Sequence, residues 1–328
     1  MIEVQALTRR YGFFTAVDHL SFNVTAGEVL GFLGPNGAGK STSMKMLTGF
    51  LAPSSGTAII NGHDIRSERI AVQRLIGYLP EGAPLYGEMT VTQMLKFAGQ
   101  IRGMNGAECQ RAVDQAIERL NLQKVRHQPT DTLSKGFKRR VGLALAILHN
   151  PKVLVMDEPT DGLDPNQKHE VRNLIQEMAA DRTIIVSTHI LEEVEAVCSR
   201  AIIIAGGKLV ADDTPAGLIR RSRFHNAVSL SVAEDSGLDA RQVASILSEL
   251  PEAANVEVNG VEVTVFPDGD VDLLSAVNNK RDEHHWQVKS MRLEAGRMDE
   301  VFRQITLGSG QAAPTGASQQ NNNKQEAA

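Results

Sequence analysis

The sequence predicts an α/β fold built on a mostly parallel sheet, followed by a smaller α+β unit. Over roughly the first 220 of the 328 residues, short β-branched runs alternate with helical patterns, which is typical of a parallel sheet covered by helices. Three of these runs are continuously apolar rather than alternating, as expected for strands that are buried on both faces. The predicted strands are 28–33, 56–60, 76–79, 153–157, 183–187 and 201–205, the last three being the continuously apolar ones.

Helices are expected where apolar residues recur with a period near 3.6. The predicted helices are 93–101, 107–120, 138–148, 166–180 and 191–198. The last of these places Leu191, Val194 and Val197 on one stripe. Its carboxylates are therefore expected on the polar face, namely Glu192, Glu193 and Glu195.

The composition shifts near residues 220–223, where the sequence reads Arg-Arg-Ser-Arg, and a second unit begins. Its pattern is strand 227–232, helix 240–249, strands 255–259 and 261–265, helix 271–281 and strand 286–292. This βαββαβ order is that of ferredoxin-like domains, with Asn259-Gly260 as the hairpin turn. From Gly308 onward the polar tail has little to bury and is expected to be disordered. The predicted division is 1–222, 223–307 and 308–328.

Composition excludes several classes of protein. No apolar run approaches the roughly 20 residues that a membrane-spanning helix needs. A formal net charge of −5 gives no basic field for DNA phosphates, so we expect no nucleic-acid partner. The two cysteines are far apart in sequence, which favours a reducing compartment. With no secretion signal at the amino terminus, the cytoplasm is the expected location.

A phosphate-binding loop is the strongest motif. Residues 34–41 match G-x-x-x-x-G-K-[ST] between a predicted strand and a helix that runs to about Thr48. The glycines allow backbone N–H groups to face a phosphate, Lys40 would reach the β- and γ-phosphates, and Ser41 would ligate Mg²⁺. The predicted phosphate-binding residues are Gly34, Pro35, Asn36, Gly37, Ala38, Gly39, Lys40, Ser41 and Thr42.

Two adjacent carboxylates end the apolar strand 153–157. Because strands alternate faces, Asp157 and Glu158 diverge and take different roles. Asp157 suits a Mg²⁺ contact, and Glu158 is placed to polarise a water for attack on the γ-phosphate. Adjacent carboxylates after a strand are usually only a solvated strand end, but a phosphate loop in the same sheet reverses those odds.

The order of three further segments narrows the class. Leu133-Ser134-Lys135-Gly136-Phe137 precedes the helix 138–148, Gly162-Leu163-Asp164-Pro165 follows Glu158, and Ser187-Thr188-His189 ends the next strand. Over roughly residues 2–220 the chain thus resembles the ATP-binding subunit of an ABC transporter, of the exporter type whose membrane domain is a separate polypeptide. The resemblance implies a P-loop NTPase, ABC-ATPase core with a helical subdomain.

The resemblance also implies roles for single residues. Tyr11 would stack on adenine, and His189 would hydrogen-bond the γ-phosphate and help to hold the attacking water. Ser134 and Gly136 match the signature segment that one subunit presents to the γ-phosphate of the other, with the helix dipole behind it. Asp164 matches the loop that communicates between the two nucleotide sites.

Two positions depart from the usual family pattern. Lys135 and Phe137 replace a glycine and a glutamine of the signature segment, while the two residues that would meet phosphate are kept. Glu81 stands where a glutamine normally contacts Mg²⁺ and water, so it is predicted as a secondary catalytic and metal-binding residue that adds negative charge beside Glu158. The basic run Lys135, Lys138, Arg139 and Arg140 is interpreted as a solvated helix start rather than a nucleic-acid patch.

We therefore expect an ATPase with ATP and Mg²⁺ as cofactors, which acts as a head-to-tail homodimer and drives export through a separate integral membrane permease. It would lie in the cytoplasm against the inner face of the cell membrane, docked through the segment 81–90. Two alternatives remain. One is a soluble ABC-type ATPase in translation or DNA repair, although no sustained heptads or second P-loop is present. The other is a non-hydrolysing regulator with a degenerate site.

Overall fold

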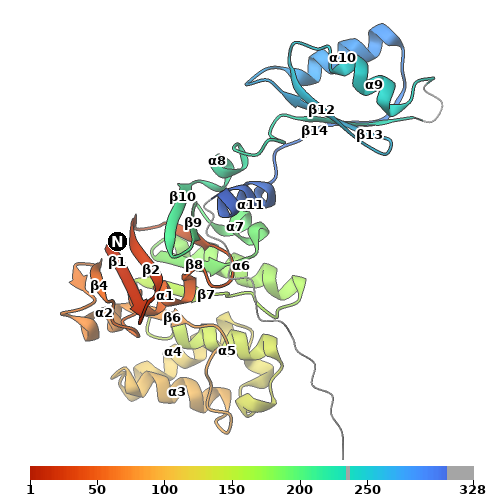
Figure 1. Cartoon of the computed structure of the whole chain (residues 1–328). Helices are drawn as coiled ribbons and strands as arrows, with labels where there is room; N and C mark the ends of the chain where they lie inside the picture. Colours follow the sequence, from red (N-terminus) through yellow and green to blue (C-terminus); the bar gives the residue numbers. More distant parts are fainter. Residues whose placement is uncertain (234–236, 309–328) are drawn as a thin grey trace, which may run out of the picture.

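The computed structural model describes residues 1–233 and 237–308, and a six-stranded sheet forms the centre of this part of the chain (Figure 1). Its order is β10-β9-β3-β8-β7-β6, and only β10 runs antiparallel to its neighbour. The α/β fold with a mostly parallel sheet is thereby confirmed. The strands are β3 (Val29–Leu33), β6 (Ile76–Leu79), β7 (Val153–Asp157), β8 (Thr183–Thr188), β9 (Arg200–Ala205) and β10 (Lys208–Asp213).

Both faces of this sheet are buried, as the continuously apolar runs predicted. Along β3, Val29 and Leu33 join one hydrophobic cluster, while Leu30 and Phe32 join another on the opposite face. The same split occurs on β8, where Ile184 and Ile185 belong to different clusters. Alternating side chains that are all apolar are what a sheet covered on two sides requires.

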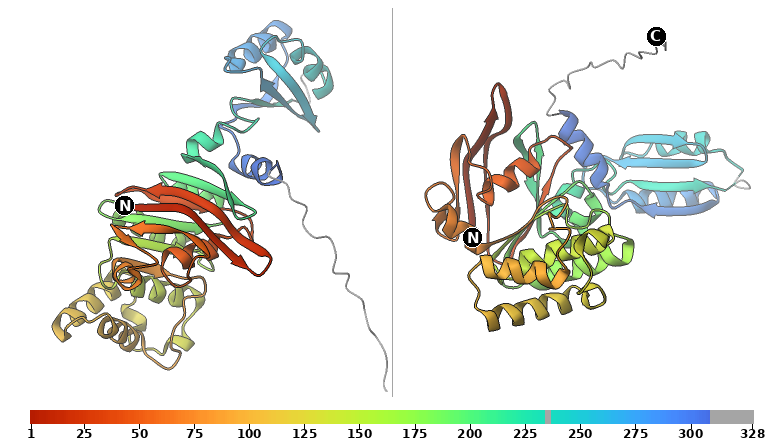
Figure 2. Two further views of the ribbon diagram at one scale, coloured as in Figure 1. Left: turned by 60° about the vertical axis from the view of Figure 1, so that its left-hand side comes forward. Right: turned by 90° about the horizontal axis from the view of Figure 1, so that it is seen from below.

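A second, antiparallel sheet with the order β2-β1-β4-β5 packs through the cluster that contains Leu30 and Phe32. In Figure 2 its red and orange strands form a layer of their own beside the central sheet. Sequence analysis found only β4, because register shifts along β1 disturb the alternation of polar and apolar residues. The strands are β1 (Ile2–Tyr11), β2 (Phe14–Val24), β4 (Ser55–Ile60) and β5 (His63–Asp64).

The predicted helices are present within a few residues of their expected bounds, whereas α2 and α8 were not predicted. Helix α5 begins at Lys135 rather than 138, because the Ser134 side chain accepts a hydrogen bond from the Phe137 N–H and caps the helix. Helices α3 to α5 form the expected helical subdomain, drawn in yellow in Figure 1. The helices are α1 (Lys40–Leu47), α2 (Arg69–Leu75), α3 (Val91–Ile101), α4 (Gly106–Arg119), α5 (Lys135–Ile147), α6 (Pro165–Ala179), α7 (Leu191–Val197) and α8 (Pro215–Ile219), with short 3-10 turns at Gln123–Val125 and Thr130–Thr132.

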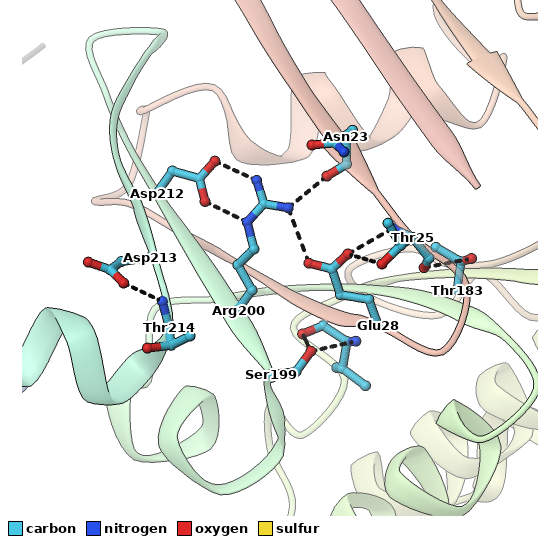
Figure 3. A network of polar contacts seen from close by, with 10 residues as sticks. Asn23, Thr25, Glu28, Thr183, Ser199, Arg200, Asp212, Asp213 and Thr214 are labelled. Atoms are coloured by element: carbon cyan, nitrogen blue, oxygen red, sulfur yellow. Dashed lines mark hydrogen bonds and ion pairs between the residues drawn. The ribbon is translucent and has the colours of Figure 1, made fainter.

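An ion-pair network ties the amino ends of the central strands together (Figure 3). Arg200, at the start of β9, donates two hydrogen bonds to Asp212 on β10, at 2.5 and 2.6 Å. A third nitrogen, Nη1, contacts the Glu28 carboxylate and the Asn23 carbonyl. These partners raise the pKa of Arg200. The network thus fixes the amino ends of these strands, opposite to the carboxyl ends where the predicted phosphate loop lies.

Residues 228–293 form a third sheet with the order β12-β13-β11-β14. All of its pairings are antiparallel and its helices lie on one face (Figure 1), which is the predicted ferredoxin-like arrangement. The predicted hairpin turn is wrong by one residue: Asn259 pairs with Glu262, so Gly260 and Val261 form the turn. The elements are β11 (Val228–Val232), α9 (Ala240–Leu247), β12 (Ala253–Asn259), β13 (Glu262–Pro267), α10 (Leu273–His284) and β14 (Val288–Leu293).

A final helix, α11 (Met298–Gly308), was not predicted and returns to the first part of the chain. It contacts α8, β9 and β10, and Met298 belongs to the hydrophobic cluster beneath the parallel sheet. Glu300 accepts a hydrogen bond from Ser222 at 2.6 Å. No helix within residues 1–233 and 237–308 is long and apolar enough to span a membrane. Of the tail that was predicted to be disordered from Gly308 onward, Gly308 ends α11 instead, and residues 309–328 lie outside the described residues.

Candidate functional site

A pocket of about 540 Å³ opens at the carboxyl ends of β3, β7 and β8. In open α/β sheets this edge is where ligands bind, because the loops that follow several strands converge there. The pocket brings together segments that are far apart in the sequence, including most of the predicted site. Its lining is Tyr11, Phe14, Ala16, Asn36, Gly37, Gly39, Lys40, Ser41, Thr42, Glu81, Glu158, Asp161 and His189.

The loop after β3 is shaped by glycines that no other residue can replace without a shift. Gly39 has a φ of +102°, and a Cβ there would lie 2.4 Å from the Ala16 carbonyl oxygen. A Cβ on Gly34 would lie 2.5 Å from the Ile204 carbonyl oxygen. The sequence folds this way because glycine alone tolerates both the backbone angle and the close approach. The result is a loop of backbone that leads directly into helix α1.

Lys40 is the first residue of α1, its side chain reaches back to this loop, and it is only 7% exposed. Its Nζ donates to the Gly34 carbonyl at 2.7 Å and to the Pro35 carbonyl at 3.2 Å. Burial lowers the pKa of Lys40, and the nearby negative charges of Glu158 and Asp157 oppose that shift. A buried cation held by neutral carbonyls is suited to an anionic ligand such as a phosphate.

Asp157, at the end of β7, is 2% exposed, and its Oδ1 is buried without a hydrogen-bond partner among the described residues. A buried carboxylate oxygen is normally paired, so an unpaired one fits a cation ligand. Ser41 lines the adjacent pocket, and both groups supply the oxygen ligands that Mg²⁺ prefers. Asp157, Ser41 and Glu81 therefore fit the predicted Mg²⁺ site.

Glu158 and His189 come together although 31 residues separate them. The His189 Nδ1 lies 2.9 Å from the Glu158 Oε1, and both side chains line the pocket. Glu158 has a φ of +51°, which is uncommon for a residue with a side chain. Its N–H donates to the Ser187 carbonyl at 2.8 Å, so β8 helps to hold this backbone. The pair is a carboxylate with a histidine at the mouth of the phosphate loop.

An aromatic pair lines another wall of the pocket. Tyr11 ends β1 and pairs in register with Phe14 at the start of β2. The Arg9 guanidinium lies 4.6 Å from the centre of the Tyr11 ring. Sequence analysis predicted Tyr11 but missed Phe14, although the intervening Gly12, with φ +57°, is a turn signal that brings the two aromatic residues together.

The structure does not bring Ser134, Gly136 or Asp164 into this pocket. Ser134 caps α5, and Asp164 caps α6 by accepting from the Gln167 N–H at 2.9 Å. The starts of α5 and α6 lie against each other, as the short distance between them shows: a Cβ on Gly136 would lie 2.5 Å from the Gln167 side chain. These predicted residues form a separate surface, apart from the phosphate loop of the same chain.

Two predictions about charged residues are wrong. Glu193 was expected on the polar face of α7, yet it is 4% exposed and accepts hydrogen bonds from Thr160 and Thr188. The basic run at the start of α5 was interpreted as solvated, yet Arg139 is 6% exposed and Arg140 forms a 2.8 Å ion pair with Glu170. Helical periodicity locates a face but does not tell which carboxylates or cations are internally paired.

Sequence analysis also missed pocket residues that carry no motif. Asp161 follows the catalytic-type carboxylates by three residues and lines the pocket, while Ala16 approaches the phosphate loop through its backbone. The proximity of Asp161 to Glu158 was an available signal. Ala16 gave none, because its contribution is a carbonyl brought near by the fold.

The fold and the pocket define a P-loop nucleotide-binding protein, and comparisons with known proteins narrow this class. Residues 17–161 match the sequence profile of the family described as "ABC transporter". A solved protein described as "Structure of ATP binding subunit of ABC transporter" superposes with a TM-score of 0.63 and 31% identity, covering 67% of this chain and 92% of that one.

Relatives with assigned names agree. The chain is 39% identical over 223 residues to the probable multidrug ABC transporter ATP-binding protein YbhF of Escherichia coli (strain K12), covering 68% of this chain and 38% of YbhF. It is 37% identical over 257 residues to the Nod factor export ATP-binding protein I of Paraburkholderia xenovorans (strain LB400), covering 78% of this chain and 83% of that protein. The chain therefore belongs to the ATP-binding proteins of the ABC transporter family, as the order of its motifs predicted.

Proposed function

We propose that this chain hydrolyses ATP and thereby powers export through a separate membrane permease. The observation that carries the proposal is the Glu158–His189 pair, which faces the same pocket as Lys40 and its glycine loop. The names of the relatives, which include a probable multidrug transporter component and a Nod factor export protein, favour an export role.

Each group in the pocket has a role that suits this chemistry. Lys40 and the loop N–H groups would bind the β- and γ-phosphates, and Tyr11 would stack on adenine with Phe14 beside it. Mg²⁺, held by Ser41, Asp157 and Glu81, would neutralise the charge on the phosphates. Glu158 would accept a proton from the attacking water while His189 orients it, a contribution of about 10²–10⁴-fold in rate.

The matching experiment replaces Glu158 by Gln, which keeps the shape of the side chain but removes the base. ATP hydrolysis should fall by at least about 10²-fold while binding of a fluorescent ATP analogue stays unchanged. Hydrolysis at the native rate would reject Glu158 as the base. If the unmodified chain hydrolyses no ATP, with or without membranes, the regulator alternative replaces the proposal.

We also infer that two copies act head to tail, each completing the other's site. Ser134 and Gly136 lie outside the pocket of their own chain. In a single chain, the open side of the pocket therefore faces solvent. Donors supplied by the start of α5 of a second copy would close that side and make closure depend on ATP. Asp164, beside Gly136 at the start of α6, would then lie between the two sites.

A dimer of this kind is testable by mass. With MgATP, the Glu158→Gln chain should form a particle of twice 35.6 kDa, measured by light scattering after size exclusion. Adding Ser134→Arg to the same chain should abolish the dimer, because the long side chain would fill the space that phosphate requires. A dimer that survives Ser134→Arg contradicts the head-to-tail arrangement.

The permease would dock on an apolar groove beside the helical subdomain. Phe50, Ile70 and Ile101 are 61–69% exposed and line a cavity of about 830 Å³ that also contains Tyr78, close to Glu81. Exposed apolar side chains gathered in one groove are typical of a protein interface. The predicted docking segment 81–90 begins soon after Tyr78, which lines this groove, and Tyr86 within the segment is also exposed.

Phe50→Glu should remove the permease from pull-downs made from membranes, with basal ATPase activity retained. Val261→Glu, at an apolar position on the β12–β13 turn that is also well exposed (59%), is the matched control. Equal recovery of the permease with both variants would place docking elsewhere. In this proposal residues 1–222 form the ATPase domain and 223–307 the accessory domain, and the protein works at the inner face of the cell membrane.

A further inference from the structure

Arg139 is the buried cation of the site that the proposed function leaves without a task. It lies one helical turn after the Ser134–Gly136 segment on α5, yet it is only 6% exposed. An arginine is seldom buried unless its donors are satisfied. The partners of its guanidinium therefore show what the residue holds.

Within the described part of the chain, the hydrogen bonds of the Arg139 guanidinium end on backbone carbonyls of two segments, one next to Glu81 and one around Glu158. Nη1 donates to the Pro80 carbonyl at 2.9 Å, next to Glu81. Nη2 donates to the carbonyls of Asp157 and Glu158, and Nε to the Pro159 carbonyl at 3.4 Å. One planar group thus joins the end of β7, the end of β6 and the start of α5.

The bonds to the end of β7 bear on the conformation of Glu158. That residue has a positive φ of 51°, which is unfavourable for a residue with a Cβ. Such a conformation persists only where the surroundings determine it. The Ser187 carbonyl holds the Glu158 N–H, and Arg139 holds the carbonyls on both sides of the Glu158 Cα.

Charge makes the position of Arg139 significant as well. Asp157, Glu158, Asp161 and Glu81 all act electrostatically on this guanidinium, and their charges oppose the lowering of its pKa by burial. Arg139 therefore compensates the additional negative charge that Glu81 brings to the site. A lysine would carry the same charge but has no planar fork to reach several carbonyls at once.

We propose that Arg139 is a positioning residue, which holds the Glu158 and Glu81 segments in their catalytic geometry and links them to the start of α5. The inference rests on the proposed function, in which Glu158 is the base and the start of α5 contacts the nucleotide of a second copy. Movement of α5 on that contact is passed through Arg139 to the Glu158 of the same chain. The two sites of a pair thereby become interdependent.

The first test is made on the chain without nucleotide. Arg139→Met should speed amide hydrogen exchange at residues 158–161, because the carbonyl anchors are lost, while the centre of β7 stays protected. The matched control is Arg182→Met, which removes a 7% exposed arginine at the opposite end of β8. Unchanged exchange at 158–161 in Arg139→Met, or an equal increase in the control, overturns the proposal.

The second test separates turnover from binding. Arg139→Met should lower kcat by roughly 10–100-fold, as misplacement of a reacting group does, and leave the Kd of a fluorescent ATP analogue within about threefold. Arg139→Lys should have a kcat between those of the native chain and the Met variant. The Lys variant also provides the test if the Met variant does not fold. Loss of binding in parallel with kcat would indicate a general structural role and would contradict the inference.

The third test concerns charge compensation. Glu81→Gln should raise kcat several-fold in the Arg139→Met background but change it less in the native chain, because only the variant carries uncompensated charge. Strictly multiplicative effects would reject the compensation. These outcomes are distinguishable from a failure of the proposed function. If the unmodified chain hydrolyses no ATP, the proposed function fails; if Glu158→Gln hydrolyses ATP at the native rate, Glu158 is rejected as the base, whatever Arg139 does.

Discussion

The chain contains two regions that are both built from helices and strands but differ in what their side chains are available to do. In the region around β3, β7 and β8, polar side chains gather at one edge of a parallel sheet, and Asp157 Oδ1 is left unpaired. In the region of β11 to β14, exposed charges are paired with one another, as Arg292 on β14 with Glu262 on β13 and Arg223, which precedes β11, with Glu257 on β12. The second region also has buried polar atoms without a hydrogen-bond partner among the described residues, Glu252 Oε2 and Trp286 Nε1, but Asp157 is adjacent in sequence to Glu158, which lines the pocket around Lys40.

The difference follows from sheet topology. Parallel strands end at the same edge, so the loops after β3, β7 and β8 meet around one pocket. Strands of an antiparallel sheet end alternately at opposite edges, which disperses the connecting loops. The comparison therefore predicts that equivalent substitutions in the two regions have unequal effects on nucleotide binding.

The largest expected contrast is between two glycines with positive φ. In Gly39→Ala, the alanine would have to adopt a φ of +102°, and its Cβ would lie 2.4 Å from the Ala16 carbonyl oxygen, so the loop must move. Affinity for MgATP should fall at least roughly tenfold. Gly260→Ala, in the β12–β13 turn, has φ +63° and open space for a Cβ.

That second variant should cost about 1–2 kcal/mol of stability and leave ATP binding intact. Titration of both variants with a fluorescent ATP analogue, together with thermal unfolding, checks the pair. Equal affinities would show that the loop after β3 is not the phosphate site.

The attachment of α11 affects stability rather than nucleotide binding, and it tests whether the two regions are mechanically joined. Met298 is 3% exposed in the cluster beneath the parallel sheet, so Met298→Ala should cost about 2–5 kcal/mol in unfolding free energy. Leu307 on the same helix is 72% exposed, and Leu307→Ala should change stability by less than about 0.5 kcal/mol. Denaturant unfolding of both variants would disprove the attachment if their effects were alike.

A pH dependence of stability is predicted from His149, which follows α5. Burial and the charge of Arg102 lower its pKa from 6.5 to about 4, and its Nε2 lies 3.1 Å from the Ile76 carbonyl. Because the unfolded chain binds the proton more tightly, stability falls as pH drops from 6.5 toward 4. Replacement of His149 by Gln should make the thermal unfolding midpoint less dependent on pH over that range. An unchanged slope of the midpoint against pH would exclude His149 as the cause.

The sequence predicted the parts of the site that carry fixed chemistry at fixed spacing. The phosphate loop, the carboxylates after β7 and the histidine after β8 needed only local patterns, because each follows an apolar strand whose burial is evident. The ferredoxin-like order of the second region was equally visible. Irregular strands such as β1, short elements such as β5 and the unpredicted helix α11 gave no clear periodic signal.

What the sequence alone determined is the chemistry that is available: a cradle of glycines, a lysine, carboxylates and a histidine in a defined order. The tertiary structure decided which of these side chains meet, and with what charges around them. It buried Glu193, which periodicity had placed in solvent, and Arg139, which was interpreted as part of a solvated basic run, and it kept Ser134 away from the pocket of its own chain. Local patterns fix backbone conformation, but burial and pairing depend on contacts between segments that only the folded chain brings together.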